Sequence, residues 1–241
     1  MKNQYFGDKR DLFKYDLALR VCQQLGLGFT FIPMLTAPDG RTDGNQIDHE
    51  KAKAGFKNSR LSSFLSECVE KNQRDIEQLK KFVADTSVRY FLYQPQERYF
   101  THGRRKKYFT GIGDKPLKDA LVLLDPDNGL EVKHSNKKHL LFKEIEMLFR
   151  RMTGDSCLMV YQHFPREEHT SYLTKRVEEL HRLLSSPIYW ISDNVIVFFF
   201  IGKTKRMQGN IRKVVRQCKA DYPQLLTNRG LPSESRTLSS L

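Results

Sequence analysis

The residues best suited to chemistry follow an apolar stretch, Ala-Leu-Val-Leu-Leu (120–124), where the chain continues Asp-Pro-Asp-Asn-Gly (125–129). Two carboxylates and an amide so close together can bind a metal ion, accept a proton or receive hydrogen bonds from an amino group. Pro126 cannot donate to a sheet ladder and Gly129 permits a sharp turn, so a strand should end here. We therefore expect an acidic group at the carboxyl edge of a sheet, although Asp and Asn also form ordinary turns and caps.

A second apolar stretch, Ser-Cys-Leu-Met-Val-Tyr-Gln-His-Phe (156–164), reads as a buried strand with His163 at its carboxyl end. If the two strands are neighbours, His163 lies close to the acidic group. A histidine there can act as acid or base, orient a substrate or bind a metal, and a rim histidine with a structural hydrogen bond is the alternative. The candidate catalytic residues are Asp125, Pro126, Asp127, Asn128 and His163.

The same carboxylates also suit a metal-dependent reaction. Asp125 and Asp127 offer hard oxygen ligands of the kind that Mg²⁺ and Mn²⁺ prefer, and Glu131, Asp8 or Asp39 could complete the set. This hypothesis predicts a nuclease that uses Mg²⁺ or Mn²⁺.

The N-terminal stretch Tyr-Phe-Gly-Asp-Lys-Arg-Asp-Leu-Phe-Lys-Tyr (5–15) opens a predicted helix. Asp11 lies three and four positions before Lys14 and Tyr15, so the three side chains share one face of that helix. An Asp–Lys pair at this spacing is usually a solvated surface contact. Lys14 beside Tyr15 could instead hold a phosphate or stack on a base.

A basic and aromatic segment, Thr-His-Gly-Arg-Arg-Lys-Lys-Tyr-Phe-Thr-Gly, occupies residues 101–111. Clustered cations neutralise phosphates, and aromatic faces stack on exposed bases, although a solvated basic loop is the alternative. The candidate nucleic-acid-binding residues are Arg104, Arg105, Lys106, Lys107 and Tyr108.

The composition favours a polyanionic partner. The chain has 241 residues and a net charge of +13, which favours DNA, RNA or an anionic membrane face as its partner. No apolar run is long enough to span a bilayer, and the polar N-terminus has no signal-peptide core, so we expect a cytoplasmic protein. Its four cysteines are widely scattered, which indicates free thiols rather than disulfides or a zinc site.

Apolar periodicity predicts the elements that position these residues. Strands alternating with helices indicate one Rossmann-like α/β domain over 1–225, with a mixed, mostly parallel sheet, helices on both faces and a closing antiparallel hairpin. We expect residues 226–241 to form a flexible tail. The predicted helices cover 11–26, 59–85 (one or two helices), 138–154, 169–186 and 207–223, and the predicted strands cover 28–36, 88–94, 120–125, 156–164 and two stretches within 188–203.

Two of these stretches carry a resemblance to a known family. The N-terminal Gly-Asp-Lys-Arg-Asp-Leu-Phe-Lys-Tyr (7–15) and the later Leu-Leu-Asp-Pro-Asp-Asn-Gly (123–129) resemble motifs of the large-subunit ribosomal RNA adenine-N6 methyltransferases. Asp127 and Asn128 stand where that family has Pro-Tyr. The chain also resembles bacterial proteins that share a Tyr-x-Gly-Asp N-terminus and the Asp-Pro-Asp-Asn-Gly motif, a resemblance that implies no function.

The methyltransferase resemblance implies a Rossmann-like fold and N-methylation of a nucleic-acid base with S-adenosylmethionine. It implies that Asp125 and Pro126 accept hydrogen bonds from the target amine, and that Asp8, Lys14 and Gly40 bind the cofactor. Three hypotheses follow: a nucleic-acid methyltransferase, a metal-dependent nuclease, and a nucleic-acid-binding module without catalysis.

Overall fold

A central sheet organises the part of the chain that the computed structural model describes, residues 1–39 and 46–228. Its seven strands lie in the order β2-β1-β3-β6-β8-β7-β9, and a two-stranded parallel sheet, β4-β5, lies beside it. Strands β2, β1, β3, β6 and β7 share one direction, whereas β8 and β9 oppose their neighbours. The strands are β1 Gly28–Pro33, β2 Tyr90–Leu92, β3 Ala120–Asp125, β4 Gly129–Leu130, β5 His139–Leu140, β6 Cys157–His163, β7 Ile188–Ser192, β8 Ile196–Gly202 and β9 Leu226–Thr227.

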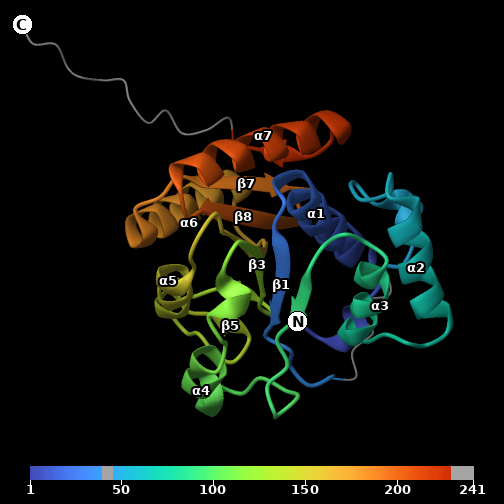
Figure 1. Cartoon of the computed structure of the whole chain (residues 1–241), viewed down its shortest axis with the longest axis horizontal. Coiled ribbons are helices and arrows are strands. Elements are labelled where there is room, and N and C mark those ends of the chain that lie inside the picture. Colours follow the sequence, from blue (N-terminus) through green and yellow to red (C-terminus); the bar gives the residue numbers. More distant parts are fainter. Residues whose placement is uncertain (40–45, 229–241) are drawn as a thin grey trace, which may run out of the picture.

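Helices cover both faces of the sheet (Figure 1). One face packs against α1 (Lys9–Leu25), α2 (Ser59–Glu70), α3 (Leu79–Ala84) and α7 (Lys205–Asp221). The other packs against α4 (Arg105–Thr110), α5 (Phe142–Arg151) and α6 (His169–Leu184). Short 3₁₀ turns lie at Asn3–Tyr5, His49–Lys51, Ile76–Gln78, His102–Arg104 and Lys115–Leu117. The predicted Rossmann-like α/β fold with a closing antiparallel hairpin is therefore confirmed.

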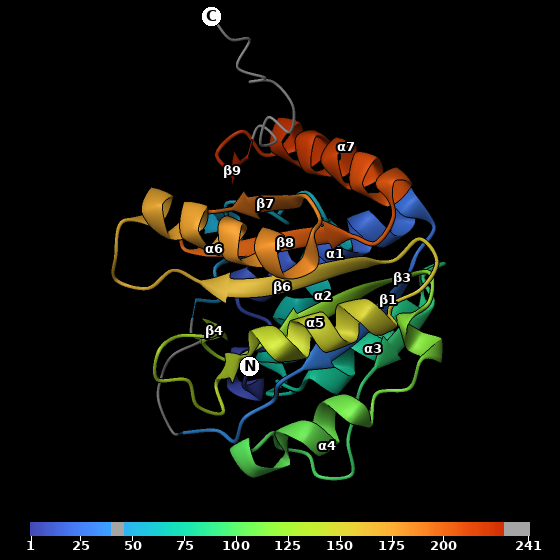
Figure 2. The same cartoon turned by 90° about the vertical axis from the view of Figure 1, so that its left-hand side faces the viewer.

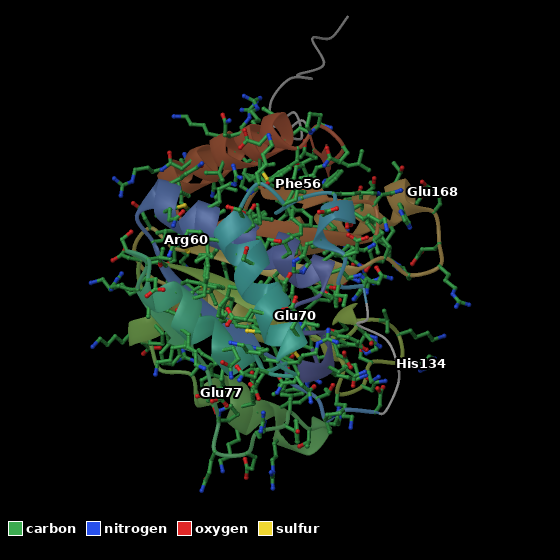
Figure 3. The ribbon with its side chains drawn as sticks, turned by 90° about the vertical axis from the view of Figure 1, so that its right-hand side faces the viewer. Phe56, Arg60, Glu70, Glu77, His134 and Glu168 are labelled. Atoms are coloured by element: carbon green, nitrogen blue, oxygen red, sulfur yellow. The ribbon has the colours of Figure 1, made fainter. Side chains whose placement is uncertain are left out.

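Burial on both faces explains the sequences of the central strands. Every residue of β1, β3 and β8 is buried, and successive side chains enter opposite cores. Phe31 belongs to the core on the side of α1 and α2, whereas Ile32 belongs to the core on the side of α4 and α5. Charged side chains instead project outward from the covering helices, as Arg60 and Glu70 do from α2 (Figure 3).

The first helix is fixed at both ends by local signals. Its N-cap, Asp8, accepts hydrogen bonds from the backbone N–H groups of Arg10 and Asp11, both at 2.9 Å. Its C-cap, Gly26, adopts the left-handed conformation with φ of 66°. The helix predicted over 11–26 is thus present with nearly the same bounds.

The strand order creates a topological switch point between β1 and β3. The chain leaves β1 to form β2 on one side, and then returns past β1 to form β3 on the other. Ligands of open α/β sheets bind beyond the carboxyl ends of the strands at such a point. Figure 2 shows the N-terminus and β4 at the edge toward which β6 points.

Several predicted elements differ from the structure in their bounds or type. The helix predicted from residue 138 begins at Phe142, because His139 and Leu140 pair with β4. The basic segment at 101–111 is a 3₁₀ turn followed by α4 rather than a loop. The predicted tail begins too early, because Leu226 and Thr227 pair with β7 as strand β9. Residues 229–241 of that tail lie outside the described residues.

The four cysteines are free thiols and all are buried, as the sequence predicted. Cys22 and Cys157 lie in the central core, Cys68 lies on α2 and Cys218 lies on α7. Within the described ranges, the structure has no helix that is both long and apolar enough to cross a membrane.

Candidate functional site

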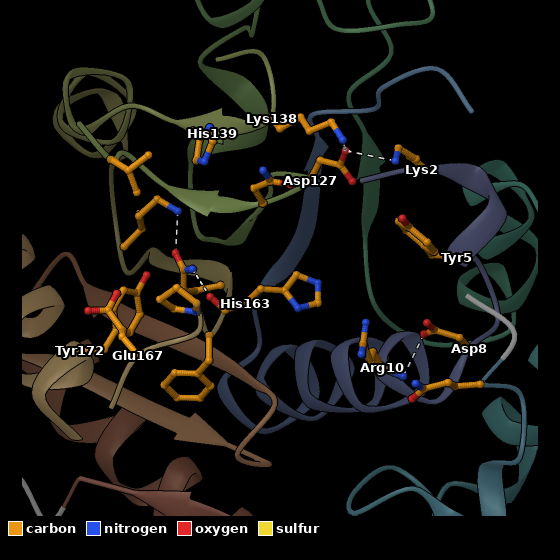
Figure 4. Close-up of a pocket in the computed structure, with 17 residues that line it drawn as sticks. Lys2, Tyr5, Asp8, Arg10, Asp127, Lys138, His139, His163, Glu167 and Tyr172 are labelled. Atoms are coloured by element: carbon orange, nitrogen blue, oxygen red, sulfur yellow. Dashed lines mark hydrogen bonds and ion pairs between the residues drawn. The ribbon is translucent and has the colours of Figure 1, made fainter. Parts of the chain in front are cut away.

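A cavity of about 560 Å³ opens beyond the carboxyl ends of β3 and β6 (Figure 4). Three parts of the chain form its walls. The N-terminal segment contributes Lys2, Tyr5, Asp8 and Arg10, the end of β3 contributes Asp127 and Asn128, and the end of β6 with the following loop contributes Gln162, His163, Phe164 and Glu167. Lys138 and Tyr172 also line it, and the volume is within the usual range for small-molecule sites.

Asp127 is the centre of a group of positive charges on one wall. Its carboxylate lies 3.7 Å from the Lys2 ammonium, 3.5 Å from that of Lys138 and 3.7 Å from the Met1 amino group. It also accepts a 3.1 Å hydrogen bond from the Thr36 hydroxyl. Burial alone would raise the pKa of Asp127, but these cations and the hydroxyl hold that pKa below its ordinary value. Asp127 is therefore an ionised carboxylate that orders its neighbours.

His163 forms another wall and is neutral at pH 7. Burial, followed by the nearby charge of Arg10, lowers the pKa of His163 from 6.5 to about 4. The Tyr161 hydroxyl lies 2.7 Å from His163 Nε2. If that hydroxyl donates to Nε2, the ring proton is on Nδ1. The Tyr161 O–H group and His163 Nε2 then each have a hydrogen-bond partner.

The buried ion triad of Asp11, Lys14 and Asp125 lies behind the cavity rather than in its lining. The Lys14 ammonium is 2.6 Å from the Asp11 carboxylate and 2.7 Å from that of Asp125. Burial raises the pKa of Asp11 to about 7, although the positive charge of Lys14 opposes this rise. For Lys14, the charges of the two carboxylates have a larger effect than burial, so its pKa is raised as well. The expected solvated Asp–Lys contact on α1 is thus a buried ion pair.

This triad corrects two site assignments. Asp125 is only 2% exposed and its carboxylate is bonded to Lys14, so it does not face the cavity as a catalytic group. Pro126 is buried beside it and does not line the cavity either. Asp127, Asn128 and His163, the other three candidates, do line the same cavity. Two neighbouring parallel strands bring them together, as predicted.

Gly129 fixes the turn that follows the acidic group. Its φ is 113°, and an added Cβ would lie 2.3 Å from Gln162 Oε1. That oxygen accepts a 2.6 Å hydrogen bond from the Leu130 backbone N–H. The close approach joins the end of β3 to β6, so only glycine satisfies both the conformation and the space.

The predicted metal ligands do not converge. Asp125 pairs with Lys14, Asp127 with Lys2 and Lys138, and Glu131 accepts a 2.8 Å hydrogen bond from the Phe142 N–H at the start of α5. Among the described residues, no group of three or more His, Cys, Asp or Glu side chains could hold a metal ion. The metal set of Asp125, Asp127 and Glu131 is therefore wrong for this fold.

The residues assigned to S-adenosylmethionine do not form one site. Asp8 lines the cavity but its carboxylate caps α1, and Lys14 is sealed between Asp11 and Asp125. Gly40 lies outside the described residues. Lys14, being buried and doubly paired, has no contact to offer a cofactor, so that assignment is corrected.

The basic segment divides into a buried part and an exposed part. Arg105 is buried and holds Glu144 with two hydrogen bonds, Nε–Oε1 at 2.6 Å and Nη2–Oε2 at 2.7 Å. Tyr108 is buried too, and its hydroxyl donates to the Pro33 carbonyl. These two are corrected from nucleic-acid contacts to structural residues. Arg104, Lys106 and Lys107 are exposed, as a phosphate contact requires.

Sequence reasoning missed several residues that line the cavity. Arg10 lies within the N-terminal motif that the sequence highlighted, two positions after the capping Asp8. Phe164 follows His163, and its ring stacks on that of His169 with centroids 3.9 Å apart. Tyr5 begins the same N-terminal motif, whereas Tyr172 comes from a distant helix, for which only the tertiary fold gives a signal.

Comparisons with known proteins add little to this geometry. No family model matches the sequence, and no curated protein matches it. Among solved structures, the chain is similar to the crystal structure of protein LPL1258 from Legionella pneumophila str. Philadelphia 1, which carries the family model DUF519. The match covers 94% of this chain and 98% of that chain at 9% identity, with a TM-score of 0.46. A likeness at that level indicates nothing about what this chain binds or does.

Proposed function

We propose that this protein binds nucleic acid on a methyltransferase-like scaffold, and that the cavity beyond β3 and β6 receives a nucleotide from the bound strand. One observation carries the proposal: aromatic side chains and cations line the same cavity at the carboxyl edge of the sheet. Tyr5, Phe164 and Tyr172 supply the aromatic rings, and Arg10, Lys2 and Lys138 supply the cations. Stacking on bases and contact with phosphates use these two kinds of group together.

The charge of the whole chain supports the same partner. The net charge is +13, and exposed cations lie on the loops next to the cavity, namely Lys133, Lys137 and Arg166. His134 and Glu168, which lie on these two loops, are at the same edge of the molecule (Figure 3). Cations in such positions neutralise phosphates on either side of a bound nucleotide and make association depend on salt.

The resemblance to ribosomal RNA adenine-N6 methyltransferases implies a narrower function, base N-methylation with S-adenosylmethionine. The closing hairpin, in which β8 is inserted antiparallel between β6 and β7, is consistent with that resemblance. That function requires the Asp125 carboxylate to accept a hydrogen bond from the target amine, but this carboxylate accepts a hydrogen bond from Lys14. We therefore assign no step to the cofactor, and binding without transfer is the form of the function that the geometry supports best.

Fluorescence anisotropy with labelled single-stranded and double-stranded DNA and RNA tests the proposal. We expect affinity to fall steeply as salt rises, and Phe164→Ala and Tyr5→Ala to weaken binding because each removes a stacking face. Phe56→Ala is the matched control, since Phe56 is an exposed phenylalanine that does not line the cavity. If no oligonucleotide binds at low salt, or if the cavity variants bind as the parent does, the proposal is wrong.

The same preparations separate the two enzymatic alternatives. Oligonucleotides are incubated with S-adenosylmethionine carrying a labelled methyl group, and separately with Mg²⁺ or Mn²⁺. Transfer of the label to the nucleic acid would establish a methyltransferase. Cleavage that disappears in Asp127→Asn would establish a nuclease. Binding with neither reaction is the outcome that we expect.

A further inference from the structure

Arg10 differs from the other cations at the cavity because its guanidinium has no carboxylate partner in the part of the chain that the structure describes. Lys2 pairs with Asp39 at 2.5 Å, Lys138 lies 3.5 Å from Asp127, and Lys14 is bonded to Asp11 and Asp125. In residues 1–39 and 46–228, no ion pair within 4.0 Å involves Arg10. Asp11, the adjacent residue, pairs with Lys14, and Asp8 uses its carboxylate to cap α1.

A second observation concerns how the Arg10 side chain is held at the cavity wall. Its Nε is enclosed by protein and has no hydrogen-bond partner among the described residues, although Arg10 as a whole is only partly buried. Arg20 and Arg176 have an enclosed Nε without a partner as well, so it is the position of the unpaired Arg10 guanidinium on the cavity wall that favours an anionic ligand. Figure 4 shows the guanidinium pointing into the cavity near His163.

The chemistry around Arg10 selects an anion with several oxygen atoms. A guanidinium presents N–H groups in a planar fork that matches a phosphate, and neutral His163 can add a single N–H donor without a second charge. The rings of Tyr5 and Phe164 line the same cavity, where a base or sugar attached to that phosphate would lie. The α1 N-terminus does not compete for the anion, since Asp8 already occupies its first N–H groups.

We propose that Arg10, with His163 beside it, binds the phosphate of a single unpaired nucleotide in this cavity. The inference rests on the proposed function and deepens it, because it names the ligand as a nucleotide rather than a nucleoside or a bare base. The nucleotide comes from a single strand or from a base flipped out of a duplex, since a paired base within a stack cannot enter a recess.

Calorimetry with nucleoside 5′-monophosphates and the matching nucleosides tests the inference. The parent protein should bind the monophosphate at least about tenfold more tightly than the nucleoside, the difference expected of one charge-assisted contact. Arg10→Gln should remove that preference and Arg10→Lys should keep part of it. Lys9→Gln is the matched control, because it removes a charge from the neighbouring position, which does not line the cavity.

Nuclear magnetic resonance of the His163 ring measures the pKa of His163 with and without bound phosphate. If Arg10 has only a structural role, phosphate should not change that pKa. The charges acting on this ring are those of Arg10, Asp125, Asp127 and the Met1 amino group. A phosphate bound between Arg10 and His163 should raise the His163 pKa in the parent protein, because an anion favours the imidazolium. Arg10→Gln should raise that pKa in the free protein and abolish the further rise with phosphate. Comparison with His163→Gln assigns the signal.

The outcomes separate this inference from the proposed function. Equal affinity for nucleoside and monophosphate, no binding of either at millimolar concentration, or an undiminished phosphate preference in Arg10→Gln would each overturn the inference. If oligonucleotides still bind with the expected salt dependence, the proposed function survives without it. If monophosphates bind through Arg10 but no oligonucleotide binds, the proposed function fails and the nucleotide site remains.

Discussion

The Lys14 ammonium lies 2.7 Å from the Asp125 carboxylate, although 111 positions separate the two residues in the chain. The contact joins the first helix to the carboxyl end of β3, and Asp11 completes the triad from within the same helix. None of the three residues is more than 4% exposed. The N-terminal segment that forms one wall of the cavity is therefore fixed to the sheet by buried charge.

Lys14→Met should destabilise the protein by about 3–5 kcal/mol, because it leaves two buried carboxylates without their cation. Urea denaturation followed by the fluorescence of Trp190 measures the free energy of unfolding. Adding Asp11→Asn and Asp125→Asn to Lys14→Met should recover much of the loss, since no buried charge then remains unpaired. A cost below about 1 kcal/mol for Lys14→Met alone would contradict a structural role for the triad.

Folding stability should depend on pH through Asp11. Its pKa rises from 3.8 to about 7 on folding, so between about pH 4 and pH 7 the folded state holds a proton that the unfolded state has lost. Stability from this group is therefore present at low pH and decreases as pH rises through that window. His163 acts in the opposite sense, because its pKa falls from 6.5 to about 4.

Comparison with Asp11→Asn isolates the contribution of Asp11. The stability of the parent protein relative to that of Asp11→Asn should fall progressively between pH 4 and pH 7, as measured by urea denaturation at each pH. Parallel profiles for the two proteins would show that Asp11 does not carry a raised pKa.

Gly129→Ala should destabilise the protein by about 1–3 kcal/mol, because φ of 113° is unfavourable for alanine. The new methyl group would also displace Gln162 from the Leu130 N–H and so alter the floor of the cavity. Gly209→Ala is the control, since a methyl group at that helical position on α7 meets nothing within 4 Å. It should stabilise by about 0.5–1 kcal/mol. Thermal unfolding compares both variants, and a neutral Gly129→Ala would count against the close approach.

Arg105 and Arg104 should behave differently although they are adjacent. Arg105→Ala removes the partner of buried Glu144 and two contacts to the Asn136 and His139 carbonyls, so it should cost about 3–5 kcal/mol of stability. Arg104→Gln, Lys106→Gln and Lys107→Gln should each change stability by less than about 0.5 kcal/mol. If these exposed residues contact phosphates, each substitution should reduce the salt dependence of oligonucleotide binding by about one ion. Equal stability of Arg104→Gln and Arg105→Ala would refute the distinction.

The strands and long helices were predictable because their apolar patterns are determined by burial on both faces of one sheet. Ala120–Asp125 and Cys157–His163 read directly as strands, and Asp8 and Gly26 mark the ends of α1. Short elements were not predictable, because two-residue strands such as β5 and β9 depend on which partner the tertiary fold brings near. Leu226 therefore read as part of a tail, although it pairs with β7.

The location of the candidate site was predictable, but the role of each residue in it was not. The ends of two parallel strands place Asp127 and His163 at one cavity, as expected if the two strands are neighbours. No sequence pattern distinguishes Asp125, which faces Lys14 in the interior, from Asp127, which faces the cavity, because orientation after the strand depends on the turn at Gly129. In the same way, Arg105 and Lys106 look alike in a basic run, and only packing against Glu144 separates them.

The burial of all four cysteines provides a means of measuring local opening of the protein without introducing a label site. A thiol-reactive dye can reach Cys22 or Cys157 only when the central sheet separates from its helices, whereas Cys68 and Cys218 need only α2 or α7 to detach. The reaction rates of the four thiols would therefore show whether the outer helices open at a lower free energy than the central sheet. Repeating the measurement with an oligonucleotide bound would show which of these thiols reacts more slowly, and thus which layer the ligand stabilises.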